Sequence, residues 1–167
     1  MLRTKYGSPD VAPKTSALAQ TITSVITFAA THVREQHKLL ADADKIAKKY
    51  RVPEKRYWYL KVQAFAESQQ WSNLRILSES RTKSPIGFKP FARAAIKGQQ
   101  TDGEILRYIE RASPEEQHEL LCEAKMWEKA LQQAFRYRDE QGLMKVKNLC
   151  NSAEIQLKAD ELLGRLA

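Results

Sequence analysis

Three histidines and two cysteines are the side chains of this chain whose chemistry could most readily support catalysis or metal binding. They are His32, His37, His118, Cys122 and Cys150. Their spacing matches no metal-binding or nucleophile motif, and no glycine-rich phosphate loop accompanies them. We therefore interpret the histidines as surface residues and the cysteines as small core residues of a protein from a reducing compartment. The sequence predicts that the protein is not an enzyme, and it indicates no catalytic residue, cofactor or metal.

Acidic residues gather where one helix is expected to begin. Ser113, Pro114 and Glu116 have the spacing of a helix start with a capping box, in which Ser113 is the N-cap. Carboxylates in a first turn favour the positive end of the helix dipole. We interpret Glu115, Glu116 and Glu119 in this way and not as an acid–base pair.

Basic residues surround a group of three aromatic residues, Tyr57, Trp58 and Tyr59, in a chain whose formal net charge is +8. A nucleic-acid site could combine such cations with stacking rings. A protein interface fits equally well, because Arg, Tyr and Trp are common anchors. The simplest interpretation is that most of the cations occupy the solvent faces of amphipathic helices. The cations are Lys45, Lys48, Lys49, Arg51, Lys55, Arg56 and Lys61.

These residues must be positioned by helices, because apolar residues recur at helical spacing along nearly the whole chain. The helix that carries the aromatic group begins near Pro53 and is apolar over most of its circumference, so we expect neighbours on more than one side of it. Residues 1–14 show no such period, and we expect a disordered tail there. The expected helices lie within residues 15–30, 39–50, 53–66, 71–80, 88–97, 104–110, 114–124, 127–135, 143–150 and 152–166.

Residues 82–96 form the segment around which the other helices are expected to be organised. Pro85 and Gly87 favour a tight turn, and Pro90 suits the first turn of a helix. The turn is either a plain connection or a binding corner that presents Lys83, Ser84 and Lys89 to a partner. The simpler interpretation is favoured by spacing alone.

Short connections between the predicted helices make sequence neighbours antiparallel neighbours in space. Residues 66–71 and 122–127 are similar, because each runs from a small residue through a polar link to a tryptophan. Repeated helix pairs indicate an all-α protein, an α-solenoid of stacked antiparallel helix hairpins over residues 15–167. A compact bundle is the competing architecture. The sequence contains no apolar run of about 18 residues, so we predict no transmembrane segment.

Two stretches, residues 51–61 and 83–91, together with Trp71 between them, resemble the C-terminal domain of the sixteenth vacuolar protein-sorting subunit or a close paralogue. The resemblance is strongest from about residue 43 to 97. That family belongs to the HOPS and CORVET tethering complexes of endosomes and vacuoles or lysosomes. The resemblance implies that this chain is the C-terminal fragment of a larger subunit.

The resemblance also implies a function as a scaffold that recruits an SM-family protein, a SNARE chaperone, for membrane fusion and vesicle transport. The implied partners are the SM subunit, the other HOPS or CORVET subunits and, indirectly, SNAREs, with no nucleic acid. The implied location is cytoplasmic, peripheral on the late endosome, lysosome or vacuole. The positions carried over as partner-binding are Arg56, Tyr57, Lys61, Ala64, Phe65, Lys83, Ser84, Phe88, Arg93, Lys97 and Arg111. A basic helical-repeat protein that binds nucleic acid is the alternative.

Overall fold

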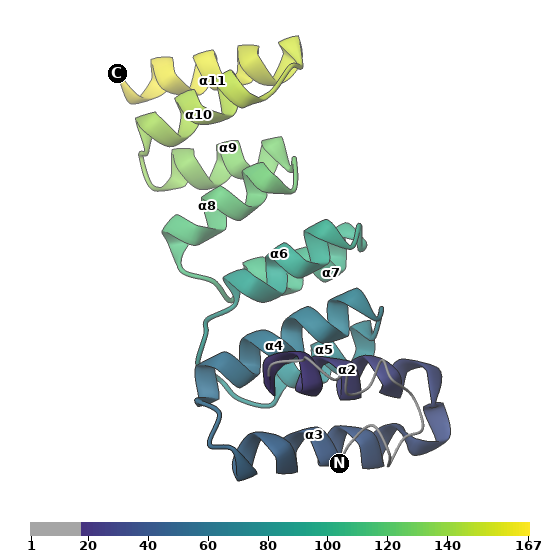
Figure 1. The fold of residues 1–167 in the computed structure, drawn as a ribbon. Helices are drawn as coiled ribbons and strands as arrows, with labels where there is room; N and C mark the ends of the chain where they lie inside the picture. Colours follow the sequence, from purple (N-terminus) through teal and green to yellow (C-terminus); the bar gives the residue numbers. More distant parts are fainter. Residues whose placement is uncertain (1–17) are drawn as a thin grey trace. The chain divides into compact units, whose positions relative to one another are not determined.

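The computed structural model of the protein describes residues 18–167, which form ten α-helices and one short 3-10 helix and contain no β-strand (Figure 1). The predicted all-α class is therefore confirmed, and successive helices pack in pairs as expected for stacked hairpins. The expected disordered tail of residues 1–14 lies outside the described residues. The chain divides into two compact units, with the boundary after Gly98.

Helix α4 is the central helix of the first unit and contacts three other helices. Helix α2 lies against both α3 and α4, and α4 also contacts α5 and α6. These contacts explain why α4 is apolar on two sides, since it has neighbours on each. The elements are α2 (Leu18–Thr31), η1 (Val33–Glu35), α3 (Gln36–Lys49), α4 (Glu54–Glu67), α5 (Trp71–Glu79) and α6 (Lys89–Lys97).

Aromatic residues join α4 to α6 in the core of the first unit. Phe91 is fully buried, and its ring lies edge-on to that of Trp58 with 6.3 Å between centroids. Phe88, the N-cap residue of α6, packs against Phe91 at 5.8 Å. Such pairs add to the free energy gained from burying the rings themselves.

The predicted turn before α6 is present. The Gly87 N–H donates to the Ser84 carbonyl at 3.1 Å, and the Ser84 hydroxyl accepts from the Ile86 N–H at 3.2 Å. Gly87 has a φ of 71°, a conformation that costs a residue with a Cβ more than it costs glycine. Pro90 lies in the first turn of α6, where its missing N–H leaves no helical hydrogen bond unmade.

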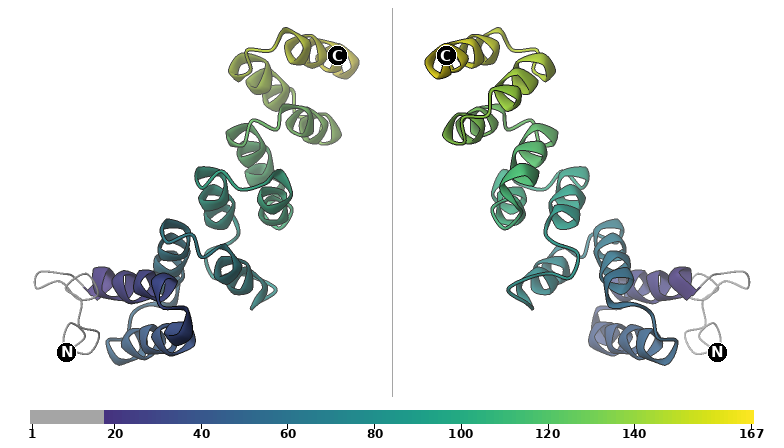
Figure 2. Two further views of the ribbon diagram at one scale, coloured as in Figure 1. Left: turned by 90° about the vertical axis from the view of Figure 1, so that its right-hand side faces the viewer. Right: turned by 90° about the vertical axis from the view of Figure 1, so that its left-hand side faces the viewer.

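The second unit contains five helices that follow one another in chain order, as both views of Figure 2 show. Helix α8 packs on α7, α9 and α10, while α11 packs on α9 and α10. Contacts with both the next helix and the one after it are typical of stacked hairpins. The helices are α7 (Asp102–Ile109), α8 (Pro114–Glu123), α9 (Trp127–Arg136), α10 (Glu140–Leu149) and α11 (Ala153–Leu166).

The weak sequence repeat corresponds to a shared turn geometry. Ahead of α5, the Gln70 N–H donates to the Phe65 carbonyl at 2.8 Å, and the residue before Gln70 has a φ of 58°. Ahead of α9, the Met126 N–H donates to the Leu121 carbonyl at 2.9 Å, and the residue before Met126 also has a φ of 58°. Both are Schellman caps, which satisfy the last carbonyls of one helix while reversing the chain for the next.

Two local predictions were wrong. His118 is buried, because α10 packs against the α8 face that carries it. Ser113 is the N-cap of α8, as predicted, but its side chain makes no capping hydrogen bond. Cys122 and Cys150 are free and buried, as predicted.

Candidate functional site

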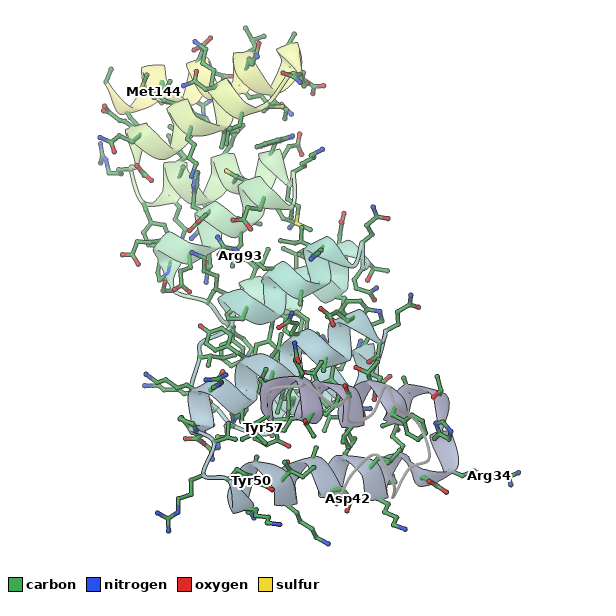
Figure 3. The ribbon with its side chains drawn as sticks, viewed as in Figure 1. Arg34, Asp42, Tyr50, Tyr57, Arg93 and Met144 are labelled. Carbon is green, nitrogen blue, oxygen red and sulfur yellow. The ribbon has the colours of Figure 1, made fainter. Side chains whose placement is uncertain are left out.

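Helix α4 contributes different residues to two grooves of the first unit. Trp58, Val62, Ala64 and Phe65 are buried, so they fix the helix against its neighbours. Trp58, Val62 and Phe65 also line the grooves, together with residues that lie between them on the helix. Tyr57 of α4 and Arg93 of α6 are labelled in Figure 3, and each belongs to one of the two grooves.

The first groove, here called the Tyr57 groove, has a volume of about 430 Å³ and is formed by α2, α3, α4 and α5 with the turn that follows α5. Ile76 is the most exposed apolar residue in it, at 64%. The groove therefore offers an apolar contact beside a polar cluster. Its lining is Ile26, Leu40, Asp44, Tyr57, Trp58, Lys61, Phe65, Asn73, Ile76, Leu77, Ser80 and Arg81.

The polar cluster of the Tyr57 groove is satisfied within the protein. The Tyr57 hydroxyl donates to the Asp44 carboxylate, and the Lys61 ammonium lies 4.4 Å from the centroid of the Tyr57 ring. Burial raises the pKa of Tyr57 far above its usual value, and Asp44 raises it further. Burial lowers the pKa of Lys61, against the attraction of Asp44. The hydrogen bond between Tyr57 and Asp44 therefore links α4 to α3 inside the groove.

The second groove, here called the Trp71 groove, has a volume of about 510 Å³ and is formed by α4, α5 and α6. Its apolar surface comes from both aromatic and aliphatic residues, and two cations, Arg93 and Lys97, stand one helical turn apart on α6. Both cations are exposed. The groove can hold an apolar side chain while its cations meet neighbouring carboxylates. Its lining is Tyr59, Val62, Gln63, Ala66, Glu67, Trp71, Pro90, Arg93, Ala94, Lys97 and Gly98.

Gly98 is required for the shape of the Trp71 groove. A Cβ added at Gly98 would lie 2.3 Å from two carbons of the Trp71 ring, well inside van der Waals contact. Any other residue at this position would displace the indole. The ring therefore occupies space that only glycine leaves open.

The structure divides the predicted partner-binding residues among several places. Tyr57, Lys61 and Phe65 come together in the Tyr57 groove, and Arg93 and Lys97 come together in the Trp71 groove. The remaining positions belong to neither groove. Arg56 lines a smaller hollow of about 180 Å³ with α2, Lys83 and Ser84 lie in the turn before α6, and Arg111 follows α7 in the second unit.

Three of the predicted contact residues are core residues. Ala64 is fully buried, and Phe65 and Phe88 are 5% and 6% exposed. Their apolar side chains hold α4 and α6 in place, which is a sufficient reason for their presence.

Tyr59, Trp71 and Ile76 were not predicted as groove residues from the sequence. Tyr59 is 52% exposed although it follows the buried Trp58. The sequence did contain a sign of this exposure. Tyr59 lies between the two apolar sides of its helix, where a large aromatic residue has no core neighbour to pack against. Trp71 was predicted only as the first residue of its helix.

No group of three or more His, Cys, Asp and Glu residues is placed to hold a metal ion within residues 18–167. None of the described helices is long and apolar enough to cross a membrane.

Comparison with known families gives the decisive match. The model of the family described as "Vps16, C-terminal region" matches residues 17–164. The chain belongs to this Vps16 C-terminal family. The resemblance found on residues 51–61 and 83–91 is therefore confirmed.

Curated relatives of the Vps16 family are similar to this chain over parts of its length. The Vacuolar protein sorting-associated protein 16 homolog of Drosophila melanogaster is 30% identical over 65% of this chain and 13% of its own length. The Vacuolar protein sorting-associated protein 16 of Saccharomyces cerevisiae is 29% identical over 73% of this chain and 16% of its own length. The homolog of Dictyostelium discoideum is 36% identical over 40% of this chain. The chain thus matches about an eighth to a sixth of the first two relatives.

Proposed function

We propose that this chain is a docking module of a vacuolar protein-sorting subunit and that it recruits an SM-family protein, a SNARE chaperone, to an endosomal or vacuolar tethering complex. Membership of the Vps16 C-terminal family supports the sorting role, since the relatives are named for vacuolar protein sorting. The proposed setting is the HOPS or CORVET complex on the cytoplasmic side of a late endosome, lysosome or vacuole.

The observation that carries the proposal is the Trp71 groove. Its apolar floor and the Arg93 and Lys97 pair combine the two features that dominate protein interfaces, an aromatic anchor and oriented charge. Residues of α4, α5 and α6 line the groove, and we expect a helix or loop of a folded partner to enter it. A partner surface that presents an apolar residue flanked by Asp or Glu would be complementary.

The Tyr57 groove is the second candidate surface for the same partner. The Lys61 ammonium in this groove already lies over two aromatic rings, 4.4 Å from the centroid of Tyr57 and 5.3 Å from that of Trp58. Reversing the charge of Lys61 would disturb the protein itself. Ile76 is a cleaner probe of this groove, because its side chain is mostly exposed.

The test is a binding titration between the chain and the purified SM protein of the same organism. The double variant Arg93→Glu, Lys97→Glu should weaken binding at least about tenfold, because it removes two rim charges and introduces two of the wrong sign. A matched control, Arg136→Glu with Lys129→Glu, makes the same charge change on α9 and should leave the affinity unchanged. Circular dichroism checks that each variant remains helical.

The possible results separate the candidate surfaces. Loss of binding in the Arg93 and Lys97 variant alone supports the Trp71 groove. Loss in Ile76→Asp alone assigns the contact to the Tyr57 groove and refutes the Trp71 assignment. Unchanged affinity in all of these variants, or no complex with the unmodified chain, contradicts the docking proposal.

A further inference from the structure

The outward face of α3 carries a stripe of four lysines. Lys38, Lys45, Lys48 and Lys49 are all exposed and fall within an arc of about 100° at the helical period of 3.6 residues. The apolar residues Leu39, Ala43, Ile46 and Ala47, on the other side of α3, are buried. In Figure 3, nitrogen-tipped side chains project from α3 on the side away from α2 and α4. We call these four residues the α3 lysine stripe.

Nearby acids neutralise the α3 lysine stripe only in part. Asp42 is 8% exposed, and the Asp44 carboxylate accepts the Tyr57 hydroxyl hydrogen bond. Glu54 pairs with Arg81 at 2.5 Å. Asp44, four residues before Lys48, and Glu35, three residues before Lys38, are the exposed acids of η1 and α3. Residues 34–56 contain eight Lys or Arg and four Asp or Glu, so the excess positive charge is concentrated there.

Helix α11 arranges the charges of its solvent face differently. Lys158 pairs with Glu154 at 3.2 Å and with Glu128 at 2.6 Å, and Arg165 pairs with Glu161 at 3.1 Å. Among the described residues, none of the stripe lysines has a carboxylate partner of this kind. Lysines three and four residues apart repel one another on a helix, although Lys48 and Lys49, in the last turn of α3, are also favoured by the negative end of the helix dipole. The dipole gives no such reason for Lys38 and Lys45.

We propose that the α3 lysine stripe docks directly on an anionic lipid bilayer, with its ammonium groups at the level of phosphatidylserine headgroups. The stripe extends over about 17 Å of a straight helix, a geometry that suits a flat charged surface. Clusters of four or more lysines on one helix face are attracted to acidic lipid in proportion to their number. The long lysine stems allow the charges to reach the headgroups from a helix lying in the plane.

A bilayer fits the stripe better than a nucleic acid does. Nucleic-acid grooves on proteins combine cations with aromatic residues that stack on bases. The four lysines stand on the outer face of a helix, and none of them lines the Tyr57 or Trp71 groove. The aromatic residue nearest the stripe, Tyr50, lies at the end of α3 with the Lys49 ammonium 5.5 Å from its ring centroid. This inference does not depend on SM-protein docking.

The test measures co-sedimentation of the chain with vesicles of phosphatidylcholine alone and of phosphatidylcholine with phosphatidylserine. We expect binding only to the second, weakening as salt is added. Changing all four stripe lysines to glutamine should lower partitioning about fivefold per lysine. The matched control changes four exposed cations of the second unit to glutamine, namely Lys125, Lys129, Arg136 and Lys145, and should lower partitioning far less.

Each other outcome overturns the proposal. Equal losses in the two fourfold variants would mean that net charge, not the stripe, determines binding. Equal sedimentation with phosphatidylcholine alone would mean that charge is not the cause. The chain could instead fail to sediment with either vesicle and bind single-stranded poly-U RNA. If the stripe variant then lost RNA binding, the stripe would be a nucleic-acid site. Circular dichroism and thermal unfolding confirm that both variants fold.

Discussion

Gln70 provides a direct test of how the first unit is held together. Its side chain is 8% exposed, in the turn between α4 and α5. The Gln70 Nε2 donates to the Ile26 carbonyl of α2 at 2.8 Å and to the Ser68 hydroxyl at 2.7 Å. Its Oε1 accepts from Asn73 at 2.9 Å and from Gln36 at 3.4 Å. One amide thus connects α2, α3, α4 and α5.

Replacing this amide with a side chain of similar size isolates its hydrogen bonds. Each intramolecular hydrogen bond contributes about 0.5–1.5 kcal/mol net, and a buried group left without its partner costs about 1–3 kcal/mol. The two hydrogen bonds donated by the Gln70 Nε2, at 2.7 and 2.8 Å, are the shortest of the four. We therefore expect Gln70→Leu to lower the free energy of unfolding by about 2 kcal/mol. For a unit of this size, that loss corresponds to a decrease in Tm of roughly 8–16 °C.

Urea unfolding followed by tryptophan fluorescence measures this loss, because Trp58 and Trp71 both lie in the first unit. The matched control is Gln63→Leu on the exposed side of α4, where the amide makes one hydrogen bond, to Glu67 at 3.1 Å. It should change stability by less than about 0.5 kcal/mol. An unfolding midpoint for Gln70→Leu equal to that of the unmodified chain would refute the reasoning. Equal losses in the two variants would do the same.

Three further predictions concern single residues. Lys125→Gly should raise the free energy of unfolding by up to about 1 kcal/mol, because the φ of 58° at this position suits glycine. The Tm should rise accordingly, whereas Lys125→Ala should give no gain. Phe91→Ala should cost about 3–5 kcal/mol in urea unfolding because its ring is fully buried, while Ile76→Ala on the surface should change little. Burial lowers the pKa of His118, so the unfolded chain takes up the proton more readily than the folded one. The resulting stabilisation is present above the ordinary histidine pKa of about 6.5 and is lost as pH falls, by at most about 1.4 kcal/mol per pH unit. In His118→Gln the stability of the chain should change less between pH 7 and pH 5, and an identical acid loss in both proteins would contradict this assignment.

The helices and the turn before α6 were predictable because their signals are local. Apolar periodicity identifies a helix from its own residues, and the Pro85 and Gly87 pair fixes the turn without help from distant segments. The similarity of residues 66–71 and 122–127 likewise reflects a turn geometry set by adjacent residues. These features required no knowledge of which helix packs on which.

The buried polar residues were not predictable for the opposite reason. Gln70 belongs to a polar link in the sequence, and only the packing of α2 over that link makes it an internal residue. His118 lies in the first half of α8 and becomes buried through contact with α10. The Trp71 groove combines three helices, so its lining depends on the angles at which they pack. Pairing between elements is not encoded in any single window of sequence.

The basic run that the sequence presents as one feature has several roles in the structure. Lys61 lies over the rings of Tyr57 and Trp58, whereas the stripe lysines of α3 face outward. The stripe and the Trp71 groove share no residue, although both belong to the first unit. A bilayer on the stripe therefore need not compete with an SM protein in the groove.

This separation makes a crossed experiment informative. The chain with four stripe lysines changed to glutamine should bind the SM protein with unchanged affinity. The Arg93→Glu, Lys97→Glu variant should sediment with phosphatidylserine vesicles nearly as the unmodified chain does, because its lost charges lie outside the stripe. If either variant loses both activities while remaining folded, the two surfaces are not independent. Binding to the vesicles and to the SM protein would then depend on the net charge of the chain and not on where each cation lies.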